Sequence, residues 1–396
     1  MNTTAIQSPP ELLADIDRVR MRSLIIGVIG IALCGAGVAM DGAQFHRSYL
    51  FAFAFFNGLS MGCLALTMLQ HLTGGTWGLM IRRIIEAGSR TFPLTLILFI
   101  PVALGVKIFP WAASGAATDA IIQEKSAYLN VNFFFIRAAV YFAIWIGLST
   151  ILSRMSAKQD AEGAEPYYSK MAVVSAPGIL LYGFTVTFAS IDWMMSLDPH
   201  WFSTIFGILL LGCQGVATFA FAIMVLVFLM KHRPMSEAVS STALHDLGKL
   251  MFAFVMLYAY FNFSQFLIIW SGNLPEENPW YLHRMHGGWQ YLSQALVVLH
   301  FIVPFLLLLS RNLKRTPGRV TKVAALLFVM QLINHFWLVA PSFFEHGIHI
   351  HWLDVAAPVG IGGLWMWYFF GQLKQRPVLP VQDPMLEEAL SSGRSH

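Results

Sequence analysis

The sequence predicts an all-α integral membrane protein with ten transmembrane helices. Of its 396 residues, 57% are hydrophobic and only 12% are charged, about half the charge of a typical soluble domain. The apolar residues form continuous runs that are long enough for spanning helices and too long and unbroken for the strands of a barrel. The basic residues stand in short clusters between these runs, which indicates membrane orientation and no nucleic-acid surface.

Ten apolar runs follow one another along almost the whole chain. A spanning helix needs roughly 20 mostly apolar residues. The runs lie at 23–40, 48–70, 92–108, 131–152, 171–191, 203–230, 247–271, 289–309, 320–340 and 353–373. The third is short, and Pro93 and Pro101 interrupt it. We expect residues 1–22 to form a cytoplasmic segment with a short interfacial helix from Glu11 to Arg22, and 374–396 to form a polar cytoplasmic tail at the surface or partly disordered.

Lysine and arginine predict the direction of the spans, because they resist translocation. With ten spans, 20 of the 25 Lys and Arg residues lie in the N-terminal segment, the tail and the loops after the even-numbered spans. Only four lie in the other loops, and Arg137 lies inside the fourth span. Both termini are therefore predicted on the cytoplasmic side of the membrane.

The sequence excludes transport powered by an ATPase domain of this chain, and it argues against a redox centre of its own. The loops are too short for a nucleotide-binding domain, and no GxxxxGK[ST] or GxGxxG motif follows a strand. Three scattered cysteines cannot hold an iron–sulfur cluster, and no CxxCH motif is present for covalent haem. His300 lies near mid-span, whereas His335 lies about 9 Å nearer the outer end by the helical rise, too uneven for a pair of haem ligands. We therefore expect no redox centre and no metal in this chain.

The predicted outer loops are rich in histidine, acidic residues and tryptophan. Seven of the 13 histidines lie there, and the tryptophans Trp193, Trp201, Trp280, Trp289 and Trp352 are typical of interfacial belts. Glu345, His346, His349 and His351 have a spacing that suits a metal ion, but a solvated or partner-facing loop is the more ordinary interpretation. The contrast with the bare inner face suggests that extracytoplasmic subunits dock on these loops.

Polar side chains recur on single faces of the spans. In hydrocarbon such groups are costly unless they face protein or water. The later spans carry Gln214 and Thr218; Tyr258, Asn262 and Gln265; Ser293 and His300; and Gln331, Asn334 and His335. The earlier spans offer Asn57, Ser60, Thr67, Arg137, Tyr141, Thr185, Thr187 and Asp192. This pattern predicts a helix bundle with a hydrogen-bonded interior.

These stripes allow two interpretations. Amides and hydroxyls hold helices together in lipid at about 0.6 kcal/mol each, which is the structural interpretation and the one that spacing alone favours. The other is a proton path in which the titratable His300, His335 and Asp192 exchange protons with water. Arg137 either pairs with Asp192 or extends to the outer interface, and extension is the more ordinary expectation.

Three long stretches resemble one known family. Ser190 to Gly207 reads SIDWMMSLDPHWFSTIFG, Asn262 to Tyr281 reads NFSQFLIIWSGNLPEENPWY, and His349 to Asp354 reads HIHWLD before Gly360 and Gly363. They resemble signatures of the F subunits of bacterial alternative complex III, which belong to the NrfD-like or polysulfide-reductase membrane-subunit family. The resemblance covers nearly the whole chain.

The resemblance implies a fold and a place in the respiratory chain. The fold would be two four-helix bundles, spans 2–5 (about 48–191) and 6–9 (about 203–340), flanked by spans 1 and 10 within a membrane domain of 23–373. Such complexes oxidise quinol, usually menaquinol, and pass electrons through iron–sulfur clusters and c-type haems of partner subunits to cytochrome c or an oxidase. The homologous C subunit carries the better-supported quinol site, while the F subunit contributes structure and possible proton translocation.

With this resemblance, the sequence favours proton conduction and the structural interpretation equally. The proton-path candidates are Asp192, Arg137, Tyr258, Asn262, His300, Gln331 and His335. The partners implied are the C membrane subunit, the iron–sulfur subunit and the c-type cytochrome subunits, with quinol bound in the complex. Two rival functions stay open: a secondary transporter with a midplane polar site, and a purely architectural membrane anchor.

Overall fold

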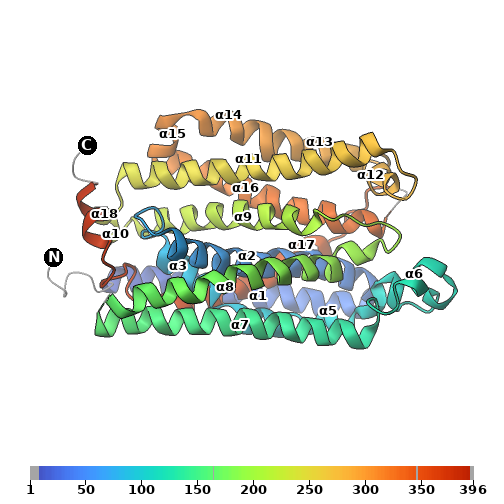
Figure 1. The fold of residues 1–396 in the computed structure, drawn as a ribbon, viewed down its shortest axis with the longest axis horizontal. Coiled ribbons are helices and arrows are strands. Elements are labelled where there is room, and N and C mark those ends of the chain that lie inside the picture. The colour runs from blue at the N-terminus through green and yellow to red at the C-terminus, as the bar shows by residue number, and fades with distance from the viewer. Residues whose placement is uncertain (1–8, 164, 345–346, 393–396) are drawn as a thin grey trace.

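The computed structural model is a bundle of long helices that lie side by side (Figure 1). It describes residues 9–163, 165–344 and 347–392. Within these ranges there is no strand, and ten helices are long and apolar enough to cross a membrane. The prediction of a multi-pass, all-α membrane protein is therefore confirmed.

Each predicted span corresponds to one helix or one series of helices. The single helices are α1 (Pro10–Met40), α2 (Gly42–Thr73), α7 (Val131–Glu162), α8 (Glu165–Trp193), α9 (Phe206–Leu229), α11 (Ser241–Gly272), α16 (Pro317–Val339) and α17 (Leu353–Leu373). The third span consists of α3 (Arg82–Ser89), α4 (Phe92–Leu98) and α5 (Ile100–Leu104). The eighth consists of α13 (Trp289–Ala295), the π-helix η6 (Leu296–Ile302) and α14 (Val303–Leu309).

The third span differs from its predicted bounds. Its apolar window belongs to a helical stretch from Arg82 to Leu104, whereas the run of apolar residues begins at 92. Pro93 and Pro101 stand at the first turns of α4 and α5, where a missing N–H costs nothing. Arg82 and Arg83, expected in a loop, are buried in α3 because acidic partners neutralise them there.

Helices α2 and α9 lie at the centre of the molecule. In the most apolar window of α2, 94% of the residues are buried, and in that of α9, 83%. By contrast, α1, α11 and the eighth span are each 22% buried in theirs and expose large apolar side chains. A helix that is apolar on all sides is suited to such a central position, and the peripheral helices present their exposed faces to lipid.

The contacts of α2 link the two halves of the chain. It packs against α3 and α8 of the first half and against α9, α16 and α17 of the second. α7 packs on α8, while α9 packs on α11 and α16. The separation into two four-helix bundles stays a prediction, because α2 contacts helices of both.

Both ends of the described chain lie at the same end of the bundle, which we call the terminal end (Figure 1). The opposite end carries the short helices α6 (Ala120–Glu124) and α12 (Asn278–His283). Asp119 caps α6, and the hydrogen bond from the backbone N–H of Ile122 is the main reason that the pKa of its carboxyl group lies below the ordinary value, followed by the nearby His200 and the N–H of Ile121.

Two expectations at the terminal end were wrong. The segment from Glu11 to Arg22 is no separate interfacial helix, because α1 continues through it with Leu12 and Ile16 buried. The tail after Lys374 is not confined to the surface. Val378 and Leu379 are buried, and α18 (Leu386–Ser392) is seated by the buried Leu386. Apolar side chains in these polar segments supply the driving force for docking.

Close backbone contact joins α1 to α17. The two helices meet where Gly27 and Gly30 of α1 face Gly360 and Gly363 of α17. A Cβ atom added at Gly30 would lie 2.4 Å from the backbone nitrogen of Gly360. Small residues permit such contact in membranes, where dispersion forces replace the hydrophobic effect as the source of helix association.

We expect the substitution Gly30→Ala to lower the free energy of unfolding by about 1–3 kcal/mol, because backbone atoms of α17 must move to admit the new methyl group. Thermal unfolding of the purified protein in detergent measures the effect. Gly35→Ala is the matched control on the same helix, since a Cβ there meets nothing within 4 Å. Equal melting temperatures for the two variants would contradict a close-packed contact.

Candidate functional site

An ion pair lies inside the first half of the bundle. Arg137 of α7 donates from Nε to Asp192 Oδ2 over 2.9 Å and from the terminal NH2 group to Oδ1 over 2.8 Å. The hydroxyl of Tyr141 donates to Oδ2 over 2.8 Å. Both charged side chains are buried. The expectation that Arg137 extends to the interface is therefore wrong, and the alternative of a pair with Asp192 is what the structure contains.

The surroundings explain why Arg137 stays inside. Its third nitrogen donates to the carbonyl oxygen of Tyr128 over 2.8 Å, and its guanidinium carbon lies 3.8 Å from the centre of the Tyr128 ring. Phe133 covers it from another side at 4.4 Å. These contacts satisfy the guanidinium group and exclude lipid, so the pair remains buried without an unpaired charge.

A second polar cluster lies in the other half. The hydroxyl of Tyr258 on α11 donates to Asn334 Oδ1 on α16 over 3.0 Å. Asn334 in turn donates to the sulfur of Cys213 on α9 over 3.4 Å. The ring of His300 lies 4.3 Å from that of Tyr258, centre to centre. Four predicted spans thus meet through these side chains.

The backbone around His300 forms a π-helix in place of a regular α-helix. His300 is fully buried and lies within the π-helix η6, just before Pro304. Proline lacks an N–H group, so the helix before it loses a regular hydrogen bond and can widen locally. Within the part of the chain that the structure describes, neither ring nitrogen of His300 has a hydrogen-bond partner. Such π-helical bulges often mark functional positions.

The other predicted residues of this half take different roles. Gln331 is fully buried; its amide contacts the thiol of Cys213, but within the described residues neither its oxygen nor its nitrogen forms a hydrogen bond of good geometry. His335, one helical turn away, places Nδ1 2.9 Å from the carbonyl oxygen of Gln331 and packs its ring on Phe55. Asn262 bonds back to the carbonyl of Tyr258 on its own helix over 2.8 Å. Asn262 therefore contributes least to the cluster.

The seven predicted residues thus form two groups on different helices. Arg137 and Asp192 join α7 to α8, while the second group lies on α11, η6 and α16 and consists of Tyr258, Asn262, His300, Gln331 and His335. Gln214 of α9 accepts a hydrogen bond from Tyr182 of α8 over 2.5 Å, so polar contact also crosses from one half of the chain to the other.

A charged cluster at the terminal end was missed by the sequence analysis. Glu86 of α3 accepts from Arg82 over 3.0 Å and from Arg83 over 2.7 Å. Arg82 also pairs with Asp383 of the tail, and Arg83 pairs with Asp160 of α7. The spacing of Arg82, Arg83 and Glu86 on one helical face was the available signal, but Asp160 and Asp383 are distant in sequence.

A second missed residue is Arg284 at the opposite end. It is buried and donates to the carbonyl oxygens of Trp280 and Leu338, each over 2.9 Å. Its guanidinium carbon lies 3.5 Å from the centre of the Trp280 ring. Burial lowers the pKa of Arg284 to about 10, so the group is still charged at neutral pH.

The tryptophans expected in interfacial belts are mostly internal. Trp193, Trp201, Trp280 and Trp289 are each at most 5% exposed. Trp201 and Trp280 stack with ring centres 4.7 Å apart. Of the five, only Trp352 is substantially exposed. The belt interpretation was therefore wrong for four of them, because their rings pack against other aromatic side chains inside the protein.

The candidate metal spacing is only partly described. Glu345 and His346 lie outside the described residues. Of the rest, His349 and His351 stack with ring centres 6.1 Å apart. The carboxylate of Asp354 accepts hydrogen bonds from the hydroxyl of Ser48 over 2.6 Å and from the backbone N–H of His351 over 2.8 Å. The described ranges contain no group of three or more residues arranged to hold a metal ion.

No protein-family model matches this chain, and no curated protein matches it.

We expect Arg137→Met to lower the free energy of unfolding by about 3–5 kcal/mol, because it leaves the Asp192 carboxylate buried without its counter-charge. The double variant Arg137→Met/Asp192→Leu removes both charges and should lose much less. Reversible unfolding in mixed detergent micelles measures both. Arg18→Met, at a side chain that is 62% exposed, is the control. A double variant as unstable as the single one would argue against a coupled pair.

Proposed function

We propose that the chain is a membrane subunit of a bacterial respiratory complex that oxidises quinol, similar to alternative complex III, and that it carries protons. The resemblance of Ser190–Gly207 and Asn262–Tyr281 to the F subunits of that complex supports the placement. The ten membrane-spanning helices are in keeping with it. The observation that carries the proton path is His300: a titratable ring, fully buried, with both nitrogens unpartnered in a π-helix.

A proton path needs groups that can both accept and donate, close enough to pass protons directly or through water. The imidazole of His300 meets this requirement beside the hydroxyl of Tyr258. Gln331 offers an amide that contacts Cys213 but forms no hydrogen bond of good geometry within the described chain, and water would complete its hydrogen bonding. His335 follows one turn later on the same helix. These four residues form the path in the second half.

Asp192 is the exchanging group in the first half. Its carboxylate can take a proton only if the contact with Arg137 or Tyr141 loosens, because both occupy its oxygens. Arg137 thereby controls the charge of Asp192 and is a positioning residue. A change in a partner subunit that shifts α7 against α8 would couple electron transfer to this step.

Electron transfer itself belongs to partner subunits in this proposal. Oxidation of one quinol releases two electrons and two protons; iron–sulfur clusters and c-type haems of the partners take the electrons. The opposite end, where α6 and α12 project, is the docking surface for the extracytoplasmic subunits (Figure 1). This chain then serves as the anchor and the route for protons.

Purification of the whole assembly tests the placement. We expect the chain, tagged at its C-terminus and extracted from native membranes in mild detergent, to carry co-purifying c-type haem and quinol:cytochrome c reductase activity. The haem spectrum and the reductase rate are the measurements. A colourless, inactive preparation, from membranes whose other respiratory complexes survive extraction, would count against the proposal and bring the secondary transporter forward.

Proton release per quinol tests the path. In the intact complex, we expect His300→Ala and Asp192→Asn to lower the number of protons released per quinol, because each removes a titratable group. Tyr258→Phe should do the same by removing only one hydroxyl. Vesicles with a pH-sensitive dye give the ratio.

Tyr49→Phe is the matched control for Tyr258→Phe. Its hydroxyl is also buried, but it bonds to the carbonyl oxygen of Leu98, away from both clusters. If His300→Ala and Asp192→Asn leave the ratio unchanged in complexes of normal composition, conduction is refuted and the chain is an architectural anchor.

A further inference from the structure

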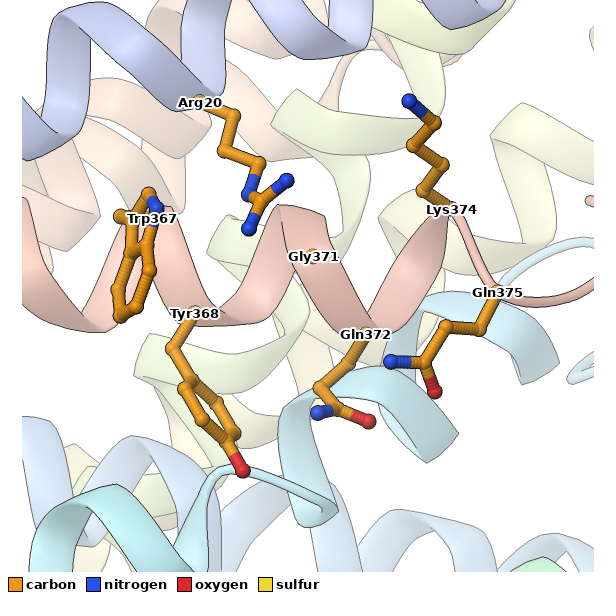
Figure 2. Close-up of a pocket in the computed structure, with 7 residues that line it drawn as sticks. All are labelled: Arg20, Trp367, Tyr368, Gly371, Gln372, Lys374 and Gln375. Carbon is orange, nitrogen blue, oxygen red and sulfur yellow. The ribbon is translucent and has the colours of Figure 1, made fainter.

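A cleft opens at the terminal end between α1 and the end of α17 (Figure 2). Its volume is about 530 Å³, enough for the headgroup of a phospholipid. Arg20 reaches into it from α1. The remaining polar lining comes from α17 and the residues that follow it: Tyr368, Gln372, Lys374 and Gln375.

The cleft has an excess of positive charge. Lys374 is neutralised by Asp17. Arg20 forms no ion pair with a carboxylate of the described chain, and its Nε is buried without a hydrogen-bond partner. Its guanidinium carbon lies 5.5 Å from the centre of the Trp367 ring, which holds the group without neutralising it. A guanidinium group left with free donors is a strong partner for a phosphate oxygen.

The glycine at position 371 makes room for this arrangement. A Cβ atom added there would lie 3.3 Å from Arg20 Nε, tighter than an ordinary contact. Arg20 therefore lies directly against the backbone of α17, where its remaining N–H groups face the cleft (Figure 2). The site is formed by the fold and is more than a loose surface charge.

The position of the cleft along the membrane normal matches the layer of lipid headgroups. Arg20 stands just before the long apolar run of α1, whose Ile25 and Ile29 are 56% and 55% exposed and face the lipid chains. Trp367 and Tyr368 are residue types that favour the membrane interface. The distribution of Lys and Arg predicts that this end faces the cytoplasm, where anionic lipids attract basic pockets between helices.

We propose that this cleft binds the phosphate group of an anionic phospholipid, with Arg20 as its main ligand. Tyr368, Gln372 and Gln375 also line the cleft, but Tyr368 and Gln372 extend from the side of α17 away from Arg20, so the guanidinium group is the ligand that the proposal depends on (Figure 2). The lipid chains then lie along the exposed face of α1. The site bridges the first and last spans, so a bound lipid holds the two ends of the chain together. It is independent of the redox assignment.

Native mass spectrometry of the delipidated full-length chain tests the site. Phosphatidylglycerol, phosphatidylcholine and inorganic phosphate are the probes. We expect phosphatidylglycerol to bind more tightly than phosphatidylcholine, and inorganic phosphate to compete poorly because it lacks the acyl chains. Arg20→Ala should weaken the binding of phosphatidylglycerol about fivefold, the effect of one basic residue at a membrane surface.

Two further variants make the result specific. Arg18→Ala removes the same charge from an exposed side chain on the same helix and should leave the affinity unchanged. Gly371→Ala keeps every charge but shifts the Arg20 guanidinium by a few tenths of an ångström, and should weaken binding less than Arg20→Ala does. Melting curves confirm that each variant is folded.

Three results would overturn the proposal. Equal affinity of Arg20→Ala and the unchanged protein would exclude Arg20 as a ligand. Equal losses for Arg18→Ala and Arg20→Ala would indicate diffuse attraction without a built site. Inorganic phosphate that displaces phosphatidylglycerol at equal concentration would indicate a site for the free anion.

Discussion

The rest of this structure depends on one constraint: hydrocarbon offers no hydrogen bonds. Every polar group within a span must find its partner inside the protein, or the chain bears a cost of several kcal/mol. Arg137 and Asp192 illustrate the solution, because the carboxylate of Asp192 and the carbonyl oxygen of Tyr128 accept hydrogen bonds from the guanidinium group, while the hydroxyl of Tyr141 donates to the same carboxylate. The charged cluster around Glu86 is a second example, where arginines and acids from α3, α7 and the tail neutralise one another.

Against that background, His300 and Gln331 belong to a small set of buried side chains whose polar atoms form no well-shaped hydrogen bond within the described chain. Both are fully buried, and Trp193, Trp201 and Thr218 are in the same position. A purely structural interior would have replaced them with apolar residues of similar volume at little cost. Their presence next to Tyr258, in a span widened by a π-helix, is the physical reason to favour proton transfer over packing alone.

Two kinds of packing hold the helices together: close backbone contact between spans, and docking of the tail at the terminal end. Between α1 and α17, glycines allow backbones to touch, because dispersion forces act only at short range. At the terminal end the tail adds an ion pair through Asp383 and buried apolar side chains, as in a soluble protein. The lipid cleft beside Arg20 lies between the contact of α1 with α17 and the docked tail.

The number of spans and their approximate positions were determined by the sequence alone, since length and hydropathy are local properties that a bilayer selects directly. The polar stripes were also readable, because 3.6-residue periodicity places them on one face. Only the tertiary structure decided which polar stripes contact one another. Arg137 could reach either solvent or Asp192, and Asp383 stands 301 residues from its partner Arg82. Such pairings depend on how helices distant in the chain are packed, and no local pattern encodes that.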